Sequence, residues 1–149
     1  MKTPKYTWNP ETGEASCIIC YNDLEFVGTA YCHPEDGDMK SKLTGQTIAE
    51  IRAMLAYLRH IRDNELRPQL KSLNQLYYSM NRSKNYNKKS YESYMLYRQI
   101  RILQNDLDTI KIEIANLRKG LKEYIEQKEK DHQIIREYHL KAQLVENNQ

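Results

Sequence analysis

The sequence has few of the residues on which membrane spans, disulfide frameworks and phosphate loops depend. No run of about 18 apolar residues occurs, and the first residues, Met1 to Lys5, lack the apolar stretch of a signal peptide. The three cysteines cannot pair evenly within one chain. We therefore expect a cytoplasmic protein with free thiols and no membrane association.

Sequence patterns typical of catalysis are also absent. The five glycines form no phosphate loop, and neither the Gly-x-Ser-x-Gly elbow nor the His-Glu-x-x-His pattern of hydrolases occurs. Three histidines, His60, His132 and His139, stand among charged residues in segments with helical patterning, where solvated surface positions are expected. We expect a binding protein that is not an enzyme, has no catalytic residues and needs no cofactor.

Charge is nearly balanced. The 149 residues are 40% hydrophobic and 29% charged, with a formal net charge of +3. This length fits one domain with a modest core, and the composition is too apolar for a chain disordered throughout. So small an excess of positive charge does not indicate a protein that coats nucleic acid, so nucleic acid is an unlikely partner.

The first part of the chain has the pattern of short strands. Tyr6–Trp8, Ala15–Tyr21 and Glu25–Tyr31 are rich in aromatic and β-branched residues and are separated by turn-forming residues. They predict a small antiparallel sheet. Because three strands bury little by themselves, we expect a helix to cover four apolar residues: Ile18, Ile19, Phe26 and Val27.

A helix with an interruption is predicted next. Cys32–Asp38 has the composition of an acidic loop, and Thr47 followed by Glu50 has the spacing of a capping box. We therefore expect a helix to begin near Thr47 and to reach Met80. Pro68 lies inside this pattern, where proline removes a backbone donor, so a kink or break is expected there.

The strongest pattern is a heptad repeat in the last third of the chain. Ser90 can cap a helix that continues almost to the end. Apolar residues alternate at spacings of four and three, which predicts a coiled-coil seam: Leu96, Ile100, Leu103, Leu107, Ile110, Ile114, Leu117, Leu121 and Tyr124. Lys128 and Asp131 interrupt the seam before Ile135 and Tyr138 resume it.

The partner of this seam is either the preceding helix or the same helix of another copy. The preceding helix is too short to cover it all, so we expect a homodimer or a higher homo-oligomer. The predicted fold is α+β: a small N-terminal antiparallel sheet, a kinked helix and a long C-terminal coiled-coil helix. Residues 1–45 form the sheet region with its acidic loop, and 46–149 form the helical region of one domain.

The cysteines suggest a metal site only weakly. Cys17 and Cys20, with Cys32 and His33 further on, fit zinc spacing loosely. On a strand, however, residues three apart point to opposite faces, and no glycine makes the tight turn of a zinc knuckle. We expect free cysteines and no bound metal.

Basic and aromatic residues gather around residues 77–101. Cations for phosphate beside aromatic faces for bases are typical of a nucleotide site, and amides can bind a base edge or a ribose. The candidate ligand-binding residues are Arg52, Arg59, Tyr77, Arg82, Lys84, Asn85, Tyr86, Asn87, Arg98 and Arg101. The alternative is a solvated basic loop whose tyrosines pack against the sheet.

Three stretches resemble a known family. At Thr44–Ala53, Arg82–Tyr86 and Lys89–Glu92 the chain is similar to small bacteriophage proteins of the Thoeris anti-defence family, and the layout agrees over nearly the whole length. Those proteins are oligomeric sponges. They bind cyclic ADP-ribose isomers made by a bacterial immune enzyme, and some also hold other cyclic nucleotides.

The resemblance implies a function in the host bacterial cytoplasm during infection. The protein would sequester a cyclic ADP-ribose isomer or another cyclic nucleotide without degrading it. Tyr77 or Tyr86 would stack on adenine, Arg52 and Arg101 would neutralise the pyrophosphate, and Asn87 would bind ribose or base. Two alternatives remain open: a nucleic-acid-binding phage accessory protein and a structural coiled-coil adaptor.

Overall fold

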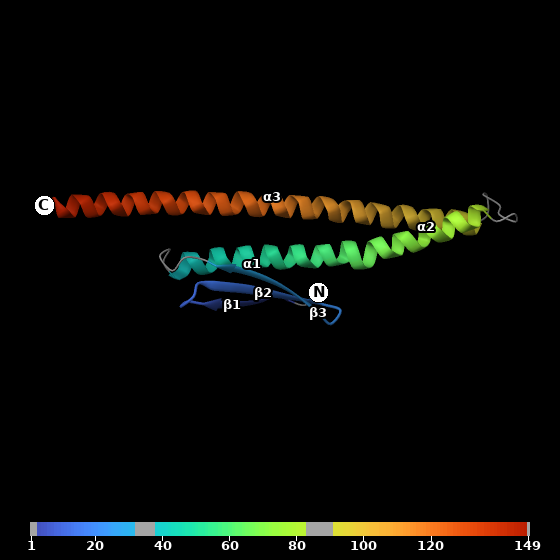
Figure 1. Ribbon diagram of the computed structural model, residues 1–149, viewed down its shortest axis with the longest axis horizontal. Helices are drawn as coiled ribbons and strands as arrows, with labels where there is room; N and C mark the ends of the chain where they lie inside the picture. The colour runs from blue at the N-terminus through green and yellow to red at the C-terminus, as the bar shows by residue number, and fades with distance from the viewer. Residues whose placement is uncertain (1–2, 32–37, 83–90, 149) are drawn as a thin grey trace. The chain divides into compact units, whose positions relative to one another are not determined.

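A three-stranded antiparallel sheet precedes the helices, as the sequence predicts (Figure 1). The computed structural model describes residues 3–31, 38–82 and 91–148, and for 38–41 the backbone alone. The chain divides into two compact units. We call Met1–Ala56 with Leu117–Gln149 the sheet unit and Tyr57–Asn116 the hairpin unit. None of the described helices combines the length and the apolar character needed to cross a membrane.

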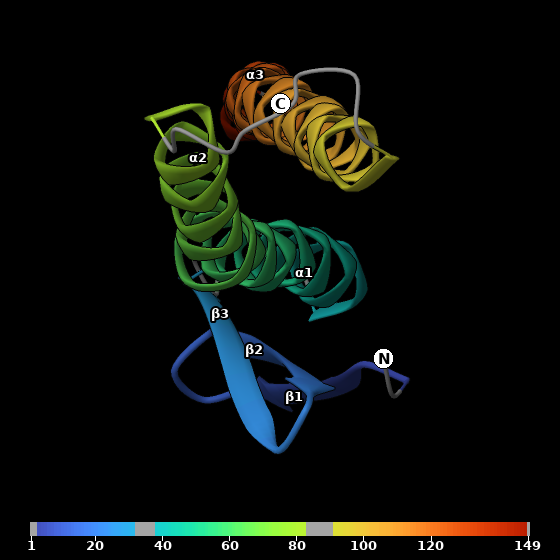
Figure 2. The same ribbon diagram turned by 90° about the vertical axis from the view of Figure 1, so that its right-hand side faces the viewer.

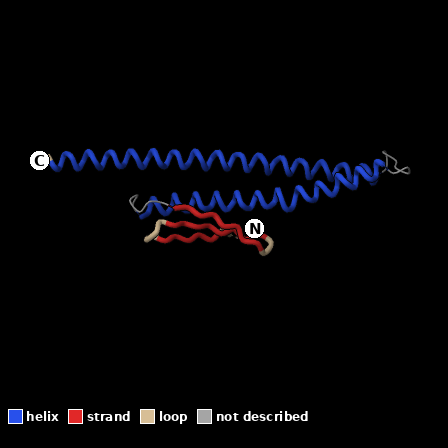
Figure 3. The backbone as a smooth tube through the Cα atoms, viewed as in Figure 1, coloured by secondary structure: helices blue, strands red, loops and turns tan. Residues whose placement is uncertain are grey.

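The strands are β1 (Lys5–Asn9), β2 (Glu14–Tyr21) and β3 (Leu24–Tyr31), in the order β1-β2-β3 (Figure 3). Each predicted strand is confirmed to within one residue at each end. Asn22 and Asp23 join β2 to β3 with φ angles of 48° and 62°. A two-residue hairpin loop of type I′ needs positive φ at both positions, and asparagine and aspartate tolerate it. The turn thereby fixes the register, in which Tyr21 pairs with Leu24.

One face of the sheet forms the core of the sheet unit. Ala15, Cys17, Ile19 and Ala30 alternate along β2 and β3 and are fully or almost fully buried. The expectation that Ile18 and Val27 also lie under a helix is wrong. These two residues pair with each other on the opposite face, and the side chain of Val27 is 51% exposed. A period of two places neighbouring residues on opposite faces.

Helix α1 (Asp38–His60) covers the inner face of the sheet at very short range (Figure 2). A Cβ atom added to Gly28 would lie 1.9 Å from the Ala49 carbonyl oxygen and 2.4 Å from the Ala53 nitrogen. The helix backbone therefore rests directly on β3, because glycine faces two alanines at the contact. No larger residue fits at position 28 without a backbone shift.

The prediction that this helix begins near Thr47 is wrong. The helix begins at Asp38, so residues 38–46, which were expected to precede it, belong to it. The hydroxyl of Thr47 donates a 2.8 Å hydrogen bond to the carbonyl oxygen of Leu43, one turn earlier. Threonine commonly makes this bond inside helices, where it has no capping function. Residues 32–37 of the expected acidic loop lie outside the described residues.

Pro68 does not break the helix. The π-helical segment η2 (Ile61–Leu66) follows α1 directly and is followed by α2 (Arg67–Arg82). The backbone N–H of Arg67 donates to the carbonyl of Arg62, five residues earlier. Pro68, the next residue, has no backbone N–H and cannot donate the hydrogen bond that would follow. A π-helical turn, which is wider than an α-helical turn, is one way in which a helix accommodates an interrupted pattern of backbone hydrogen bonds. The irregularity therefore precedes the proline.

The long helix α3 (Tyr91–Asn147) carries the predicted seam. In the hairpin unit, Leu103 and Leu107 are buried with Leu70 of α2, and Leu66, Leu73 and Ile100 pack around them. In the sheet unit, Leu121, Tyr124 and Ile125 pack against the core that α1 and the sheet form. Two segments of the same seam therefore contribute to two cores of one chain.

Two glycine substitutions test the close approach of α1 to β3. Gly28→Ala should lower the free energy of unfolding by about 1–3 kcal/mol, because the methyl group enters an occupied space. Gly120→Ala is the matched control: nothing lies within 4 Å of its Cβ position in α3, so it should stabilise by about 0.5–1 kcal/mol. Urea denaturation followed by circular dichroism measures both. Equal stabilities for the two variants would contradict the packing described.

Candidate functional site

The polar face of α2 follows from its apolar spacing. Leu66, Leu70, Leu73 and Tyr77 form the side that packs toward α3, and these positions alternate at spacings of four and three. One residue further along, the helix has turned by about 100°. The residues that follow the seam therefore form a second stripe beside it, and this stripe is polar and aromatic: Arg67, Lys71, Asn74 and Tyr78.

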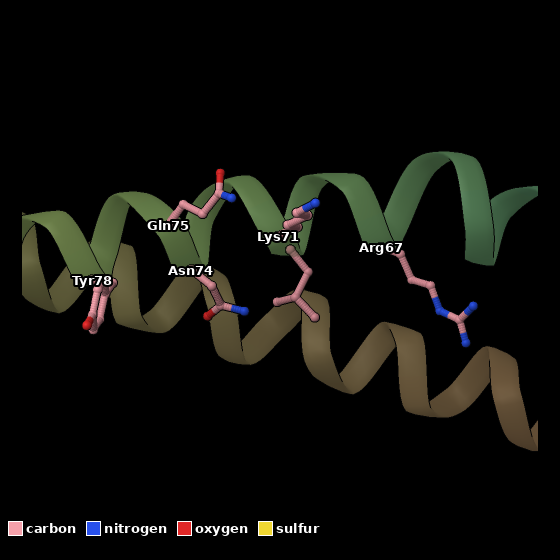
Figure 4. Close-up of a pocket in the computed structure, with 6 residues that line it drawn as sticks. Arg67, Lys71, Asn74, Gln75 and Tyr78 are labelled. Carbon is pink, nitrogen blue, oxygen red and sulfur yellow. The ribbon is translucent and has the colours of Figure 1, made fainter.

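These residues line an open groove of about 570 Å³ along α2 (Figure 4). The lining residues all come from this helix: Arg67, Leu70, Lys71, Asn74, Gln75 and Tyr78. Leu70 is buried and the other five are exposed at least in part. A volume of several hundred Å³ is typical of small-molecule sites, although this groove is open to solvent along its length. The lining combines cations, amides, an aromatic ring and one apolar residue.

The groove is positively charged. Arg67 and Lys71 are its two cations, and its described lining contains no carboxylate. The nearby Asp63 accepts hydrogen bonds from Arg62 at 2.8 and 3.1 Å and from Arg67 at 2.7 Å. One carboxylate therefore faces two guanidinium groups, which leaves an excess of one positive charge. Hydrogen bonds from Arg62 are the main cause that lowers the pKa of Asp63, so this carboxylate stays ionised at neutral pH.

Tyrosine rings lie at the end of the groove nearest the C-terminus of α2. The guanidinium carbon of Arg82 lies 4.6 Å from the centre of the Tyr78 ring, a cation–π distance. The Tyr77 ring lies 6.3 Å from that of Tyr97 on α3, tilted by 44°. Tyr78 is 58% exposed, so part of its ring is accessible to a ligand. An exposed ring with a cation on it is a suitable surface for stacking a base.

Helix α3 places further polar residues on the same side of the hairpin unit. Tyr97 and Arg101 each follow a seam residue, Leu96 and Ile100, as the groove residues do on α2. When two helices pack antiparallel, positions that follow the seam face each other on one side. The contact of Tyr97 with Tyr77 agrees with this arrangement. Tyr97 and Arg101 therefore belong to the stripe of α3 that faces the polar stripe of α2.

The other residues predicted for the site have different positions. Arg98 lies one residue beyond Tyr97 and faces further from the seam, and Arg59 is exposed near the end of α1. Arg52 belongs to the sheet unit, where its guanidinium donates a 2.6 Å hydrogen bond to the carbonyl of Thr29 on β3. The structure thus brings Arg82 onto Tyr78 of the groove and Tyr77 beside it, and gives Arg52 a contact with the sheet.

Four predicted residues, Lys84, Asn85, Tyr86 and Asn87, lie outside the described residues. The groove instead contains residues that were not predicted: Arg67, Lys71, Asn74, Gln75 and Tyr78. The density of basic residues near position 85 predicts a site around that position. The groove could have been predicted from the helical period of α2, because polar or aromatic residues follow each apolar seam residue by one position.

The two described cysteines lie apart on β2. Cys17 is buried on the inner face of β2, whereas Cys20 lies on the opposite face. Burial raises the pKa of the Cys17 thiol, and the negative charge of Glu50 adds to this effect, so the thiol is protonated and unreactive at neutral pH. No three His, Cys, Asp or Glu side chains are grouped as metal ligands within the part of the chain that the structure describes.

Asp63 should restrain anion binding in the groove. Asp63→Asn removes the carboxylate that Arg62 and Arg67 share, so pyrophosphate should bind roughly threefold to fivefold more tightly. Asp23→Asn makes the same charge change in the hairpin loop between β2 and β3, where asparagine tolerates the positive φ, and should leave affinity unchanged. Isothermal titration with inorganic pyrophosphate measures both. Unchanged affinity in the Asp63 variant would show that the carboxylate does not control the groove.

Comparison of the chain with protein-family models, with curated proteins and with solved structures finds no match. The residues of the groove and their chemistry are therefore the basis on which a function is proposed.

Proposed function

We propose that the protein binds a cyclic ADP-ribose-type signalling nucleotide and sequesters it without degrading it, as a phage counter-defence protein. The observation that carries this proposal is the α2 groove, in which two cations, two amides and a partly exposed tyrosine ring line one continuous surface. Phosphates need cations, a base needs an aromatic face, and ribose or a base edge needs amides. The resemblance to the Thoeris anti-defence family supports the same function.

In this proposal each part of the ligand has its own side chains. Arg67 and Lys71 bind the pyrophosphate, and Arg101 of α3 adds a third cation from the opposite border. Tyr78, held on one side by Arg82, stacks on the adenine. Asn74 lies between the cations and the ring in sequence, and its amide binds a ribose hydroxyl or the base edge.

The free energies of the individual contacts limit how tightly one groove can bind the nucleotide. A hydrogen bond to a charged group contributes about 1.5–3 kcal/mol, and stacking of a base on an aromatic ring about 1–3 kcal/mol. After the cost of association, a few such contacts correspond to a micromolar complex, near −8 kcal/mol, and fall short of the −12 kcal/mol of a nanomolar one. Tighter sequestration would need contacts beyond this open groove. A second protomer in a homodimer or higher homo-oligomer is the source we propose.

The open form of the groove also favours an alternative. The residues from Arg67 to Arg82 follow about 22 Å of helix, and a single-stranded nucleic acid could lie along them. Several phosphate contacts would make the logarithm of the affinity fall steeply with the logarithm of the salt concentration. A single pyrophosphate would give a weaker dependence. Titration of a short oligonucleotide and of cyclic ADP-ribose over a salt series separates the two functions.

Substitutions in the groove test the proposal directly. Lys71→Ala and Tyr78→Ala should each weaken cyclic ADP-ribose binding roughly fivefold or more, since the lysine contact contributes about 1.5–3 kcal/mol and the stacked ring about 1–3 kcal/mol. Tyr78→Phe keeps the ring and should bind nearly as the native protein does. Lys111→Ala removes an exposed lysine of α3 outside the groove and should have no effect. Isothermal titration calorimetry measures the four affinities.

Two further readouts accompany the titration. Ligand released by denaturation should be chemically intact by chromatography, as sequestration requires. A structural coiled-coil adaptor would show no ligand-dependent stabilisation, whereas ligand at about 100 times its dissociation constant should add about 2.7 kcal/mol to the free energy of unfolding. Native affinity in both alanine variants would show that the nucleotide does not bind in the groove.

A further inference from the structure

The last part of α3 extends beyond the core of its own chain. From Glu126 to Asn147 every side chain is exposed except those of Asp131 and His132, which are partly buried. Large apolar side chains are nevertheless frequent there, with exposed fractions from 39% to 71%: Ile134, Ile135, Tyr138, Leu140, Leu144 and Val145. A helix of about 22 residues with so little packing is only marginally stable in water.

The heptad repeat continues through this extension without a shift. Leu121 and Tyr124, which pack against the core of the sheet unit, are followed at spacings of four and three by six further seam positions: Lys128, Asp131, Ile135, Tyr138, Ala142 and Val145. The first two are charged and the last four are apolar. The extension thus has the sequence of a coiled-coil strand whose partner the described chain does not supply.

The two charged positions determine the direction of a partner helix with the same sequence. A parallel pair in register would place Lys128 against Lys128 of the second copy, and Asp131 against Asp131. Like charges inside a seam are destabilising. An antiparallel pair avoids both contacts.

One antiparallel register overlaps all six seam positions. It places Ile135 opposite Tyr138 of the second copy, and the twofold axis repeats this contact to form the apolar centre. Asp131 then lies opposite Ala142 of the second copy, and Lys128 opposite Val145. Shifting the pair one heptad toward the core would require Leu121 and Tyr124, which already pack within their own chain. A shift the other way leaves the two charged positions without partners.

Charges beside the seam are complementary in the same register. Glu146 follows Val145, so it lies next to Lys128 of the second copy. Lys141 precedes Ala142, so it lies next to Asp131 of the second copy. The twofold axis repeats both ion pairs, which gives four around the apolar centre. Within the chain, Lys128 lies 5.4 Å from the Tyr124 ring and Asp131 accepts a 3.0 Å hydrogen bond from Gln127; neither contact neutralises its charge.

We propose that the C-terminal extension of α3, residues 126–147, is a docking surface for the same segment of a second copy of this chain. The two segments form an antiparallel helix pair with Ile135 and Tyr138 at its centre and the ion pairs Lys128–Glu146 and Asp131–Lys141 between protomers. This interface does not involve the α2 groove, so it stands or fails independently of nucleotide binding.

Charge reversal with mass measurement tests the pairing on the full chain. The native protein should sediment with at least twice the 17.8 kDa mass of one chain. Lys128→Glu places a carboxylate beside Glu146 of the second copy, and Glu146→Lys places an ammonium beside Lys128. Each variant alone should therefore lose this interface and show half the native mass, while circular dichroism shows that the helices outside residues 126–147 remain folded.

An equimolar mixture of the two variants is the decisive measurement. Its protomers have opposite charges at every paired position, so the mixture should recover the native mass. Lys130→Glu is the control, because Lys130 lies outside the seam and its reversal should leave the mass unchanged. A monomeric native protein, a native mass in either single variant, or a mixture that stays dissociated would overturn the proposed interface.

Discussion

The apolar seam of α3 is the constraint on which the rest of the structure depends. Its first half buries Leu103 and Leu107 against α2, and its second half places Leu121 and Tyr124 against the core beneath α1. Neither core is large, and α1 covers only one face of the sheet. Because one continuous helix contributes to both, a disturbance of its heptad phase would affect both cores.

The groove is a consequence of the same seam. Residues that follow seam positions by one lie beside the contact between helices, where they are near a partner helix yet still reach solvent. On α2 these positions hold Arg67, Lys71, Asn74 and Tyr78, and on α3 they include Arg101. Leu70 gives this open groove one buried apolar lining residue between the exposed cations. Packing and candidate function therefore use adjacent stripes of one helix.

Much of the fold could be predicted from the sequence because its signals are periodic and local. Alternation defined the three strands to within a residue, and the spacing of leucines defined the seam of α3. The predicted start of α1 is wrong because a threonine with a glutamate three residues later occurs inside helices as well as at their ends. The prediction that a helix covers Ile18 and Val27 is wrong because a single helix reaches only one face of the sheet.

The site was predictable only in part. Tyr77 and Arg82 are predicted because they are aromatic or cationic, and their ring contacts place them beside the groove. Lys71 and Asn74 carry no motif, and only their angular position on α2 distinguishes them from other polar residues. Arg52 shows the converse case. Its guanidinium is equally suited to a phosphate and to a backbone carbonyl, and composition does not distinguish the two.

The bond from Arg52 also bears on how the sheet ends. Thr29 pairs with Ser16 at a position where, counting back from the hairpin, the backbone carbonyl of β3 points away from β2. Strand β3 has no neighbour on that side within the described sheet, so its outward carbonyls would accept a foreign strand. By occupying one of them, a side chain from α1 closes part of this edge against unwanted strand addition, and the protein gains protection from aggregation without a fourth strand.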